Sequence, residues 1–432
     1  MRMAGGRTTS VSGILTIAAV LVLAVGACAA PEVWVAPPPA GDDGHPGTQA
    51  SPFATLPKGA AEVDLGGVIH IGAGTFVETL TIDKDLSLQG AGVTKTTLKA
   101  TQGKEGFGLF IEAGTTVTLS HLTIGSQSGW HYLRGIRNSG TVSLNYCAVK
   151  GNYAGINGTA GIDNRGTLTL VHTTVSGNSG DNEGGGIGNS GTAVLINSTI
   201  SGNTTEQESG GGIWNSVSSS LTVVSCTITG NTSADRGGGV YSSFEGTVLV
   251  KNSIIAGNTA SNGSPDFGGT LTSRGYNVIG NNDGCFLTPT TGDQVGTPAD
   301  PIDPLLGPLQ NNGGPTETHA LLLGSPAIDA GSCNDIAGNP IATDQRGFVR
   351  HKPCDIGAFE YGAILPYGLG DVNGDAIIDL IDVRLCTQIV TGYIPGTPQQ
   401  RAAADVDGDG DVDMDDATIL AEFIIGIRTT LP

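Results

Sequence analysis

The stretch RGIRNSGTVSLNYCAVKGN, residues 134–152, returns with variations along the middle of the chain. The later copies are AGIDNRGTLTLVHTTVSGN (160–178), GGGIGNSGTAVLINSTISGN (184–203), GGGIWNSVSSSLTVVSCTITGN (210–231) and GGGVYSSFEGTVLVKNSIIAGN (237–258). An aliphatic anchor returns every 25–27 residues, at Ile136, Ile162, Ile187, Ile213 and Val240. A closing asparagine returns every 25–28 residues, at Asn152, Asn178, Asn203, Asn231 and Asn258. A fixed period in this range is typical of a solenoid.

The pattern inside each repeat predicts strands rather than helices. Segments such as TLTLV (167–171) and TVLVK (247–251) are short, rich in β-branched residues and separated by Gly, Ser and Asn. Three such strands per repeat, each stacked on its counterpart in the next coil, predict an all-β parallel β-helix solenoid. We expect the closing asparagines to form an internal amide ladder. We expect a second inward column at Val149, Val175, Ile200, Ile228 and Ile255.

The repeat also places two of the seven cysteines. Five residues before each closing asparagine stands a small residue, at Cys147, Thr173, Ser198, Cys226 and Ser253. Cys147 and Cys226 then lie three coils apart, roughly 14 Å at about 4.8 Å per coil. A disulfide needs Cα atoms within about 7 Å. We therefore predict two separate buried thiols, while Cys285 has no evident partner.

Residues 45–300 resemble the pectin-lyase-like right-handed parallel β-helix superfamily. The stretch DGHPGTQASPFATLPKGAAEVDLGGVIHIGAGTFVETLTIDKDLSLQGAG (43–92) resembles the beginning of such proteins. The resemblance implies that ATLPKGAAEV (54–63) is a short helix over the open end of the core, because a solenoid must shield its terminal cross-section. An activity does not follow from this fold.

Residues 301–362 resemble the closing segment of bacterial surface proteins of the choice-of-anchor Q type. They spell GSPAIDAG (324–331), TDQRG (343–347) and CDIGAFEY (354–361). The resemblance implies a cap at the C-terminal end of the β-helix, followed by an anchoring module, and we expect Cys333 and Cys354 to be disulfide-bonded there. For Asp329, Asp344 and Arg346 a charge-paired structural role is favoured over a functional site.

Two aspartate-rich stretches follow, DVNGDAIIDLID (371–382) and DVDGDGDVDMDD (405–416), offset by 34 residues. Their oxygen-bearing residues fall at loop positions one, three, five, nine and twelve, and position seven offers a backbone carbonyl. This spacing wraps a chain around Ca²⁺, which takes 6–8 oxygen ligands. The predicted ligands are Asp371, Asn373, Asp375, Ile377, Asp379 and Asp382 in the first loop, and Asp405, Asp407, Asp409, Asp411, Asp413 and Asp416 in the second. Each loop runs into an amphipathic helix, no helix is expected before either loop, and Cys386 is expected in the core of the first helix.

Residues 370–432 therefore resemble a type I dockerin, a small all-α module of paired calcium loops and helices. The resemblance implies two calcium ions as cofactors and a cohesin-domain protein as partner. Positions ten and eleven of each loop, where the resemblance places cohesin contacts, are Leu380 and Ile381, then Met414 and Asp415. They depart from the hydroxyl residues of clostridial dockerins, which leaves the type of cohesin open. Ala376 stands where the second loop has Gly410, so we expect the first site to be weaker.

The residue after each anchor should point outward from the β-helix, because side chains alternate along a strand. This predicts an exposed column at Arg137, Asp163, Gly188, Trp214 and Tyr241, beside a rim with Asp181, Glu183, Glu206, Glu208, Asp235 and Arg236. Aromatic faces beside charged groups suit a polysaccharide. We favour polysaccharide binding without catalysis. A polysaccharide lyase or glycoside hydrolase, and a structural adhesin without a ligand groove, remain as alternatives.

Charge and the N-terminal residues suggest where the protein works. The formal net charge of −20 argues against nucleic acid as a partner. Arg2 and Arg7, the apolar run at 14–25 and the small residues after it have the order of a signal peptide, expected at 1–30. The run is short for a membrane span, which takes about 20 residues, so we expect no transmembrane segment in the mature chain. The sequence predicts a secreted or cell-surface protein, with Cys28 as an alternative lipid-anchor site and linkers at 31–44 and 363–369.

Overall fold

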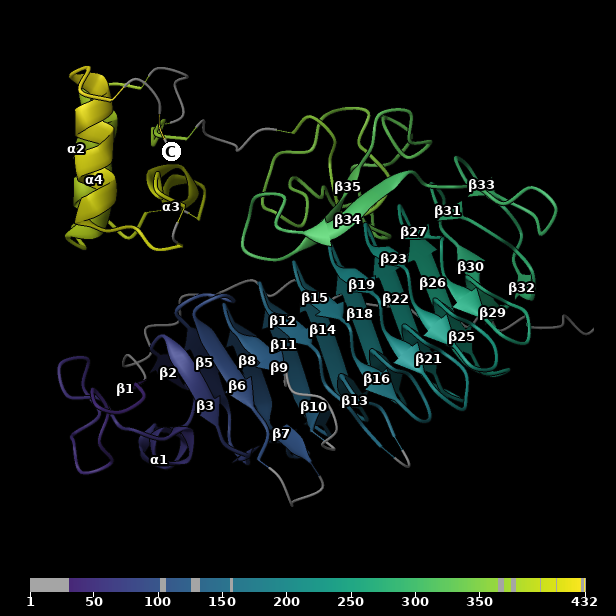
Figure 1. Ribbon diagram of the computed structural model, residues 1–432, viewed down its shortest axis with the longest axis horizontal. Coiled ribbons are helices and arrows are strands. Elements are labelled where there is room, and N and C mark those ends of the chain that lie inside the picture. Colours follow the sequence, from purple (N-terminus) through teal and green to yellow (C-terminus); the bar gives the residue numbers. More distant parts are fainter. Residues whose placement is uncertain are drawn as a thin grey trace, which may run out of the picture.

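The structure is a computed structural model that describes residues 31–101, 106–125, 133–155, 158–363, 369–373, 378–396, 398–408, 410–428 and 431. The predicted signal peptide and Cys28 lie outside these residues. The coils of a parallel β-helix stack along the long axis of the molecule (Figure 1).

Each coil contributes strands to long parallel sheets, which we number in the order in which residues 134–152 meet them. Sheet 1 runs β4 (Leu80–Ile82), β7 (Phe107–Ile111), β10 (Arg134–Asn138), β13 (Ile162–Asn164), β17 (Ile187–Asn189), β21 (Ile213–Asn215), β25 (Val240–Ser242), β29 (Phe267–Thr270) and β32 (Cys285–Phe286). Sheet 2 runs β1 (Glu32–Val35), β2 (Gly67–Ile71), β5 (Leu86–Gly90), β8 (Thr116–Ser120), β11 (Thr141–Asn145), β14 (Thr167–Val171), β18 (Thr192–Ile196), β22 (Ser220–Val224), β26 (Thr247–Lys251) and β30 (Thr272–Ser273). Sheet 3 runs β3 (Gly74–Val77), β6 (Thr96–Lys99), β9 (Thr123–Gly125), β12 (Ala148–Lys150), β15 (Thr174–Ser176), β19 (Thr199–Ser201), β23 (Thr227–Thr229), β27 (Ile254–Ile255), β31 (Val278–Ile279) and β33 (Gln294–Val295).

The sequence predicted three strands per coil, and the structure adds a fourth in several coils. The additional sheet 4 runs β16 (Ser179–Gly180), β20 (Thr204–Thr205), β24 (Thr232–Ser233) and β28 (Thr259–Ala260). These two-residue strands lie in the connections from sheet 3 to sheet 1. The connections are polar, so their sequence has no hydrophobic pattern from which a strand could be predicted.

The strand register confirms the predicted columns. Ile136 pairs with Ile162, and the column continues through Ile187 and Ile213 to Val240. The anchors and the second column are fully buried in one continuous core. The cysteine column is also confirmed, since Cys147 and Cys226 are separate buried thiols.

Buried asparagines stack in two ladders through the β-helix, of which the sequence predicted one. In the predicted ladder, Nδ2 of Asn152 donates to Oδ1 of Asn178 over 2.8 Å, and the pattern continues to Asn258. The second ladder runs through Asn138, Asn164, Asn189 and Asn215, two residues after the first four anchors. Its amides also donate to the start of sheet 2 in the next coil, as Asn138 does to Thr167 O over 3.0 Å. The ladders therefore satisfy the polar groups at the corners of each coil.

The N-terminal end of the β-helix corrects the expected linker at 31–44. Strand β1 pairs in parallel with β2, and Val33 and Val35 are buried in the core, so this segment is the first strand of sheet 2. The expected end helix is present as α1 (Leu56–Glu62), with Thr55 as N-cap and Leu56 and Gly59 buried. Gly59 is close to the core, since a Cβ there would lie 2.7 Å from Val35 Cγ2. The helix therefore closes the core.

Residues 301–362 form a lateral cover, not the end-cap that the sequence suggested. Strands β34 (Leu306–Gln310) and β35 (Thr318–Leu321) pair antiparallel and lie beside sheet 3 (Figure 1). Ile254, Ala256 and Val278 point outward from the β-helix and pack against Leu321, Ala327, Ile356 and Phe359 of the cover. Gln345 joins two coils, accepting from Thr199 Oγ1 over 2.6 Å and donating to Thr174 Oγ1 over 2.9 Å. The cover therefore buries an outer face that sequence alternation assigns to solvent.

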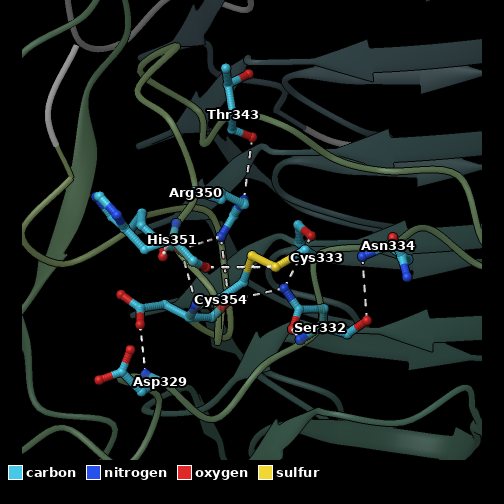
Figure 2. Close-up of a disulfide and its surroundings, with 12 residues drawn as sticks. Asp329, Ser332, Cys333, Asn334, Thr343, Arg350, His351 and Cys354 are labelled. Carbon is cyan, nitrogen blue, oxygen red and sulfur yellow. Dashed lines mark hydrogen bonds and ion pairs between the residues drawn. A yellow bond between two sulfur atoms is a disulfide. The ribbon is translucent and has the colours of Figure 1, made fainter. Parts of the chain in front are cut away.

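The expected disulfide is present in this cover. Cys333 and Cys354 are bonded, with Cα atoms 5.4 Å apart (Figure 2). Nearby, Arg350 forms a buried ion pair with Glu360 over 3.1 Å and donates to Asn197 of the β-helix. Arg346 and Asp344 form a second buried pair over 2.7 Å, as expected for a structural role. Both ion pairs lie within the cover, and the bond from Arg350 to Asn197 links the cover to the β-helix.

The C-terminal module consists of α2 (Leu380–Val390), α3 (Pro398–Ala404) and α4 (Met414–Ile424). Residues 34 positions apart occupy equivalent places in its core, since Val372 and Val406 are both buried, as are Cys386 and Leu420. Helix α3 corrects the expectation that no helix precedes either loop, because it ends directly before Asp405. The sequence PQQRAAA explains it, with Pro at the first position followed by strong helix formers. Among the described residues no helix is both long and apolar enough to cross a membrane.

Candidate functional site

The two acidic loops of the C-terminal module are folded by the same aspartates that were predicted as metal ligands. Asp379 and Asp413 are the N-caps of α2 and α4, and Asp382 and Asp416 complete capping boxes three residues later. Asp416 also closes its loop, since Oδ1 accepts from Val406 N over 2.8 Å and Oδ2 from Asp413 N over 2.9 Å. Asp382 does the same from Asn373 N and Asp379 N. Loop positions nine and twelve therefore serve helix capping and loop closure together.

The second loop gathers carboxylates closely enough for one cation. Carboxylate oxygens of Asp405, Asp407 and Asp416 lie within 4.8 Å of one another, and so do those of Asp411, Asp413 and Asp416. Asp416 is buried, and desolvation raises its pKa. A set made only of oxygen donors suits a hard cation such as Ca²⁺, which would also relieve the repulsion between these charges. The residues therefore fit the predicted ion, and Asp411 contributes its carboxylate to the cluster where only its carbonyl was predicted.

Part of the predicted ligand set lies outside the described residues, namely Asp375, Ile377 and Asp409. In the first loop Asp371 and Asp382 are buried and Asn373 is half-buried. The described part of the first loop repeats the closing hydrogen bonds of the second, but its first two ligand positions are more buried, since Asp405 is half-buried and Asp407 exposed.

The predicted contact residues form two equivalent exposed patches. Leu380 is 66% exposed and Ile381 44% exposed at the start of α2, and Met414 is 54% exposed at the start of α4. Asp415, beside Met414, is also exposed. Large apolar side chains at the first turn of a helix gain nothing from solvent, so these positions are suited to a protein partner.

The second candidate site is the outer face of sheet 1. The register places Arg137, Asp163, Gly188, Trp214 and Tyr241 in one column, as predicted. Its first part is an ion-pair cluster, because Asp163 lies 3.1 Å from Arg165 Nη2 and 3.9 Å from Arg137 Nε. Trp214 and Tyr241 are half-buried neighbours in the other part. The column thus separates into a charged half and an aromatic half.

Tyr241 also lines a groove that the sequence did not predict. This groove has a volume of about 470 Å³ and lies at the C-terminal end of sheet 1, between β25, β29 and β32. Its other side chains include Arg236, Phe244, Asn262, Asp283 and Phe286. Phe244 lies in a turn and Phe286 beyond the last clear repeat, so periodicity gives no signal that they meet.

The predicted acidic rim is present beside sheet 1. Gly180 pairs with Thr205, which aligns Asp181 with Glu206 in the next coil. Burial and the Glu206 charge raise the pKa of Asp181. Burial, Glu208 and Asp163 raise the pKa of Glu183. Asp235 instead accepts hydrogen bonds from Ser209 Oγ and Asn262 Nδ2, so it is anchored.

Comparisons with known proteins match the C-terminal module. Residues 369–425 match the family described as "Dockerin type I domain". Among solved structures, "Crystal structure of pectate lyase Pel9A" is similar with 12% identity and a TM-score of 0.46, covering 78% of this chain and 97% of that chain. A likeness this distant carries no information on activity. The comparison with curated proteins gives no match. The duplicated loops and helices, their capping aspartates and the family match together identify residues 369–425 as a dockerin type I domain that follows a parallel β-helix.

Proposed function

We propose that this protein is a secreted or cell-surface polysaccharide-binding β-helix, held on a cohesin-type partner by its calcium-loaded dockerin domain. The observation that carries the docking role is the duplicated module, in which each half combines an acidic loop with exposed apolar residues at the start of its helix. Calcium would bind Asp371, Asn373, Asp375, Ile377, Asp379 and Asp382 in the first loop, and the corresponding residues of the second. It would neutralise the loops and fix the two helices in position.

The polysaccharide role is supported by the aromatic half of sheet 1. Trp214 and Tyr241 are adjacent in register, and the glycines Gly188 and Gly268 stand on either side of them in the same column. A flat strip with aromatic rings and no large neighbours can accept a sugar chain lying along it. Arg137 and Asp163 would border this strip at its charged end.

Docking is tested by calorimetric titration of the full chain with type I cohesin domains of several bacterial groups, with and without calcium. We expect calcium-dependent binding, weakened at least tenfold by the paired changes Leu380→Ala and Met414→Ala. Leu323→Ala is the matched control, because Leu323 is an 84% exposed leucine in the lateral cover. Calcium-independent binding, or binding insensitive to the paired changes, would contradict the proposed mode of docking.

A polysaccharide-degrading enzyme is the second candidate function. It is favoured by the paired carboxylates Asp181 and Glu206, because a raised pKa suits a general acid and two carboxyl groups are the basis of glycoside hydrolysis. Release of reducing ends would indicate a hydrolase, and an unsaturated product absorbing in the ultraviolet would indicate a lyase. Activity lost in Asp181→Asn but kept in Asp300→Asn would establish the enzyme. If the protein binds a polysaccharide but forms no product, the binding function stands. If it neither binds nor degrades any polysaccharide, a structural adhesin is the remaining function.

A further inference from the structure

We infer that the polysaccharide site is centred on the groove formed by Tyr241, Phe244 and Phe286, here called the aromatic groove, and that its ligand is an uncharged polysaccharide. This inference rests on the proposed polysaccharide binding and names its position and ligand class. The groove is assembled from the last strands of sheet 1, since β25, β29 and β32 lie side by side at the C-terminal end of the β-helix (Figure 1).

The aromatic side chains are unusually exposed. Phe244 is 96% exposed and Phe286 is 72% exposed, and both line the same groove. Each ring has no polar atom, so water gains nothing from its exposure. A patch of apolar rings beside polar groups is typical of a binding surface. Rings of this kind stack on the apolar faces of sugars.

The floor of the groove is built from glycine, which lets a ligand approach the backbone. Gly263, Gly268, Gly269 and Gly284 all line it. Gly268 pairs with Tyr241 in register, and a Cβ there would lie 3.1 Å from Tyr241 Cδ2. The missing side chain therefore makes room for the tyrosine ring and leaves its face beside an open floor.

Polar groups on the rim can orient hydroxyl groups. Asn262 is held by Asp235, to which its Nδ2 donates over 3.0 Å, and its amide oxygen can accept a hydrogen bond. Asp283 accepts from Ser264 N over 3.3 Å through Oδ2 and has further acceptor capacity. Arg236 is exposed and offers donors. Donors and acceptors beside aromatic rings match the mixed character of a sugar.

Charge along the rest of the face decides the class of polysaccharide. A chain extending from the groove over sheet 1 passes the rim with Asp181, Glu183, Glu206 and Glu208. Burial raises the pKa of Asp181 and of Glu183, and the negative charges of Glu206 beside the first and Glu208 beside the second raise it further. The whole chain carries a formal net charge of −20. A polyanionic polysaccharide would be repelled along this path, whereas an uncharged one would not.

The test measures binding of the full chain, with calcium present, by affinity electrophoresis in gels containing galactomannan, hydroxyethyl cellulose, mixed-linkage β-glucan or polygalacturonate. We expect retardation by at least one uncharged polysaccharide and none by polygalacturonate. The dissociation constant should change less than twofold between 0.05 and 0.5 M salt. Phe244→Ala with Phe286→Ala should weaken binding at least tenfold, while the exposed control Leu323→Ala changes it less than twofold.

Each contrary result has a separate meaning. Binding to polygalacturonate alone overturns the ligand class and leaves the proposed polysaccharide binding intact. Unchanged binding by the double phenylalanine variant overturns the position of the site only. Binding to none of the polymers overturns this inference and the polysaccharide part of the proposed function, but not docking. A dimer that the double variant converts to monomer in sedimentation velocity would make the aromatic groove an interface between copies of the chain and overturn the inference.

Discussion

Asp266 Oδ1 accepts hydrogen bonds from both the backbone N–H and the side-chain Nδ2 of Asn258, each over 2.9 Å. Every earlier member of this ladder makes the same two bonds to an asparagine in the next coil. The amide of each asparagine therefore donates toward the next coil, which gives the ladder a direction. The side chain at its last position has to accept these hydrogen bonds but has no further coil to which it must donate. Asn277 and Asp293 repeat this ending over 3.0 Å beside it.

Asp266→Asn should destabilise the β-helix although it removes a buried charge. Asp266 Oδ2 accepts a hydrogen bond from Asn281 N over 2.7 Å. In the variant an amide nitrogen would take the place of this oxygen, so two hydrogen-bond donors would face each other. We expect a loss of about 1–3 kcal/mol in the free energy of unfolding, the cost of an unsatisfied buried donor. Urea unfolding measures it, with exposed Asp300→Asn as control. Unchanged stability would mean that the ladder has no fixed direction at this end.

Asn203→Asp, in the middle of the ladder, should lower the free energy of unfolding more than Asp266→Asn at its end. Asn203 Nδ2 donates to Val175 O and to Asn231 Oδ1, so a carboxylate there would face two acceptors. The site is fully buried. We expect a loss of about 3 kcal/mol or more. Equal urea midpoints for the two variants would contradict the directional ladder.

Removal of the Cys333–Cys354 disulfide by Cys333→Ser with Cys354→Ser should loosen the lateral cover. The bond closes a loop with a sequence separation of 21. Loss of such a crosslink costs about 3 kcal/mol. Hydrogen exchange should rise in residues 301–362 and stay low in the strands of sheet 2. The control is Cys285→Ser, which removes a free thiol. Exchange that rises equally in sheet 2 would show that the cover is not an independent unit.

Mild acid should weaken the contact between the cover and the β-helix through His172. Burial lowers the pKa of His172 to about 4, with Asp344 opposing and Arg350 adding to this shift. Its ordinary pKa is 6.5, so the unfolded state binds a proton first as the pH falls. The stability from neutral His172 is complete above pH 6.5, is lost between pH 6.5 and 4, and falls no further below 4. At most about 3 kcal/mol is involved.

His172→Asn checks this pH dependence, since asparagine tolerates the left-handed backbone of His172 (φ 50°) and does not titrate in this range. The variant should have a flatter stability profile between pH 4 and 6.5 than the control His351→Asn, which changes an exposed histidine. Identical slopes for the two variants would assign the acid sensitivity to other groups.

Calcium removal should affect the dockerin domain and leave the β-helix folded. A chelator should lower the melting temperature and helix content of α2 and α4, because the acidic loops then repel themselves. Asp416→Asn should weaken calcium binding at least tenfold, about 1.4 kcal/mol, because Asp416 belongs to both carboxylate clusters. Asp415→Asn, in the same turn, is the control. If calorimetry finds the same calcium affinity in both variants, Asp416 is not a calcium ligand.

The sequence predicted the parts of this protein that are set by periodicity and ligand spacing. Ile136 through Val240 could be aligned because each coil must bury the same positions, and Asp405 through Asp416 could be read because calcium loops have fixed spacing. The second asparagine ladder was missed, although Asn138, Asn164, Asn189 and Asn215 recur two residues after the first four anchors. Sheet 4 was missed because its two-residue strands have no hydrophobic pattern.

Two features depend on long-range contacts and could not be predicted from local pattern. The lateral cover lies along sheet 3 because Ile254 and Val278 point outward and are buried by Leu321 and Phe359, a match between segments far apart in sequence. The aromatic groove exists because the turn after β25 and strand β32 bring Phe244 and Phe286 to the same end of sheet 1. The sequence by itself determined the coil, its core and the acidic loops, since these follow from repeated local demands. Only the tertiary structure decided which outer faces are covered and which remain open, because that depends on where non-repeating segments pack.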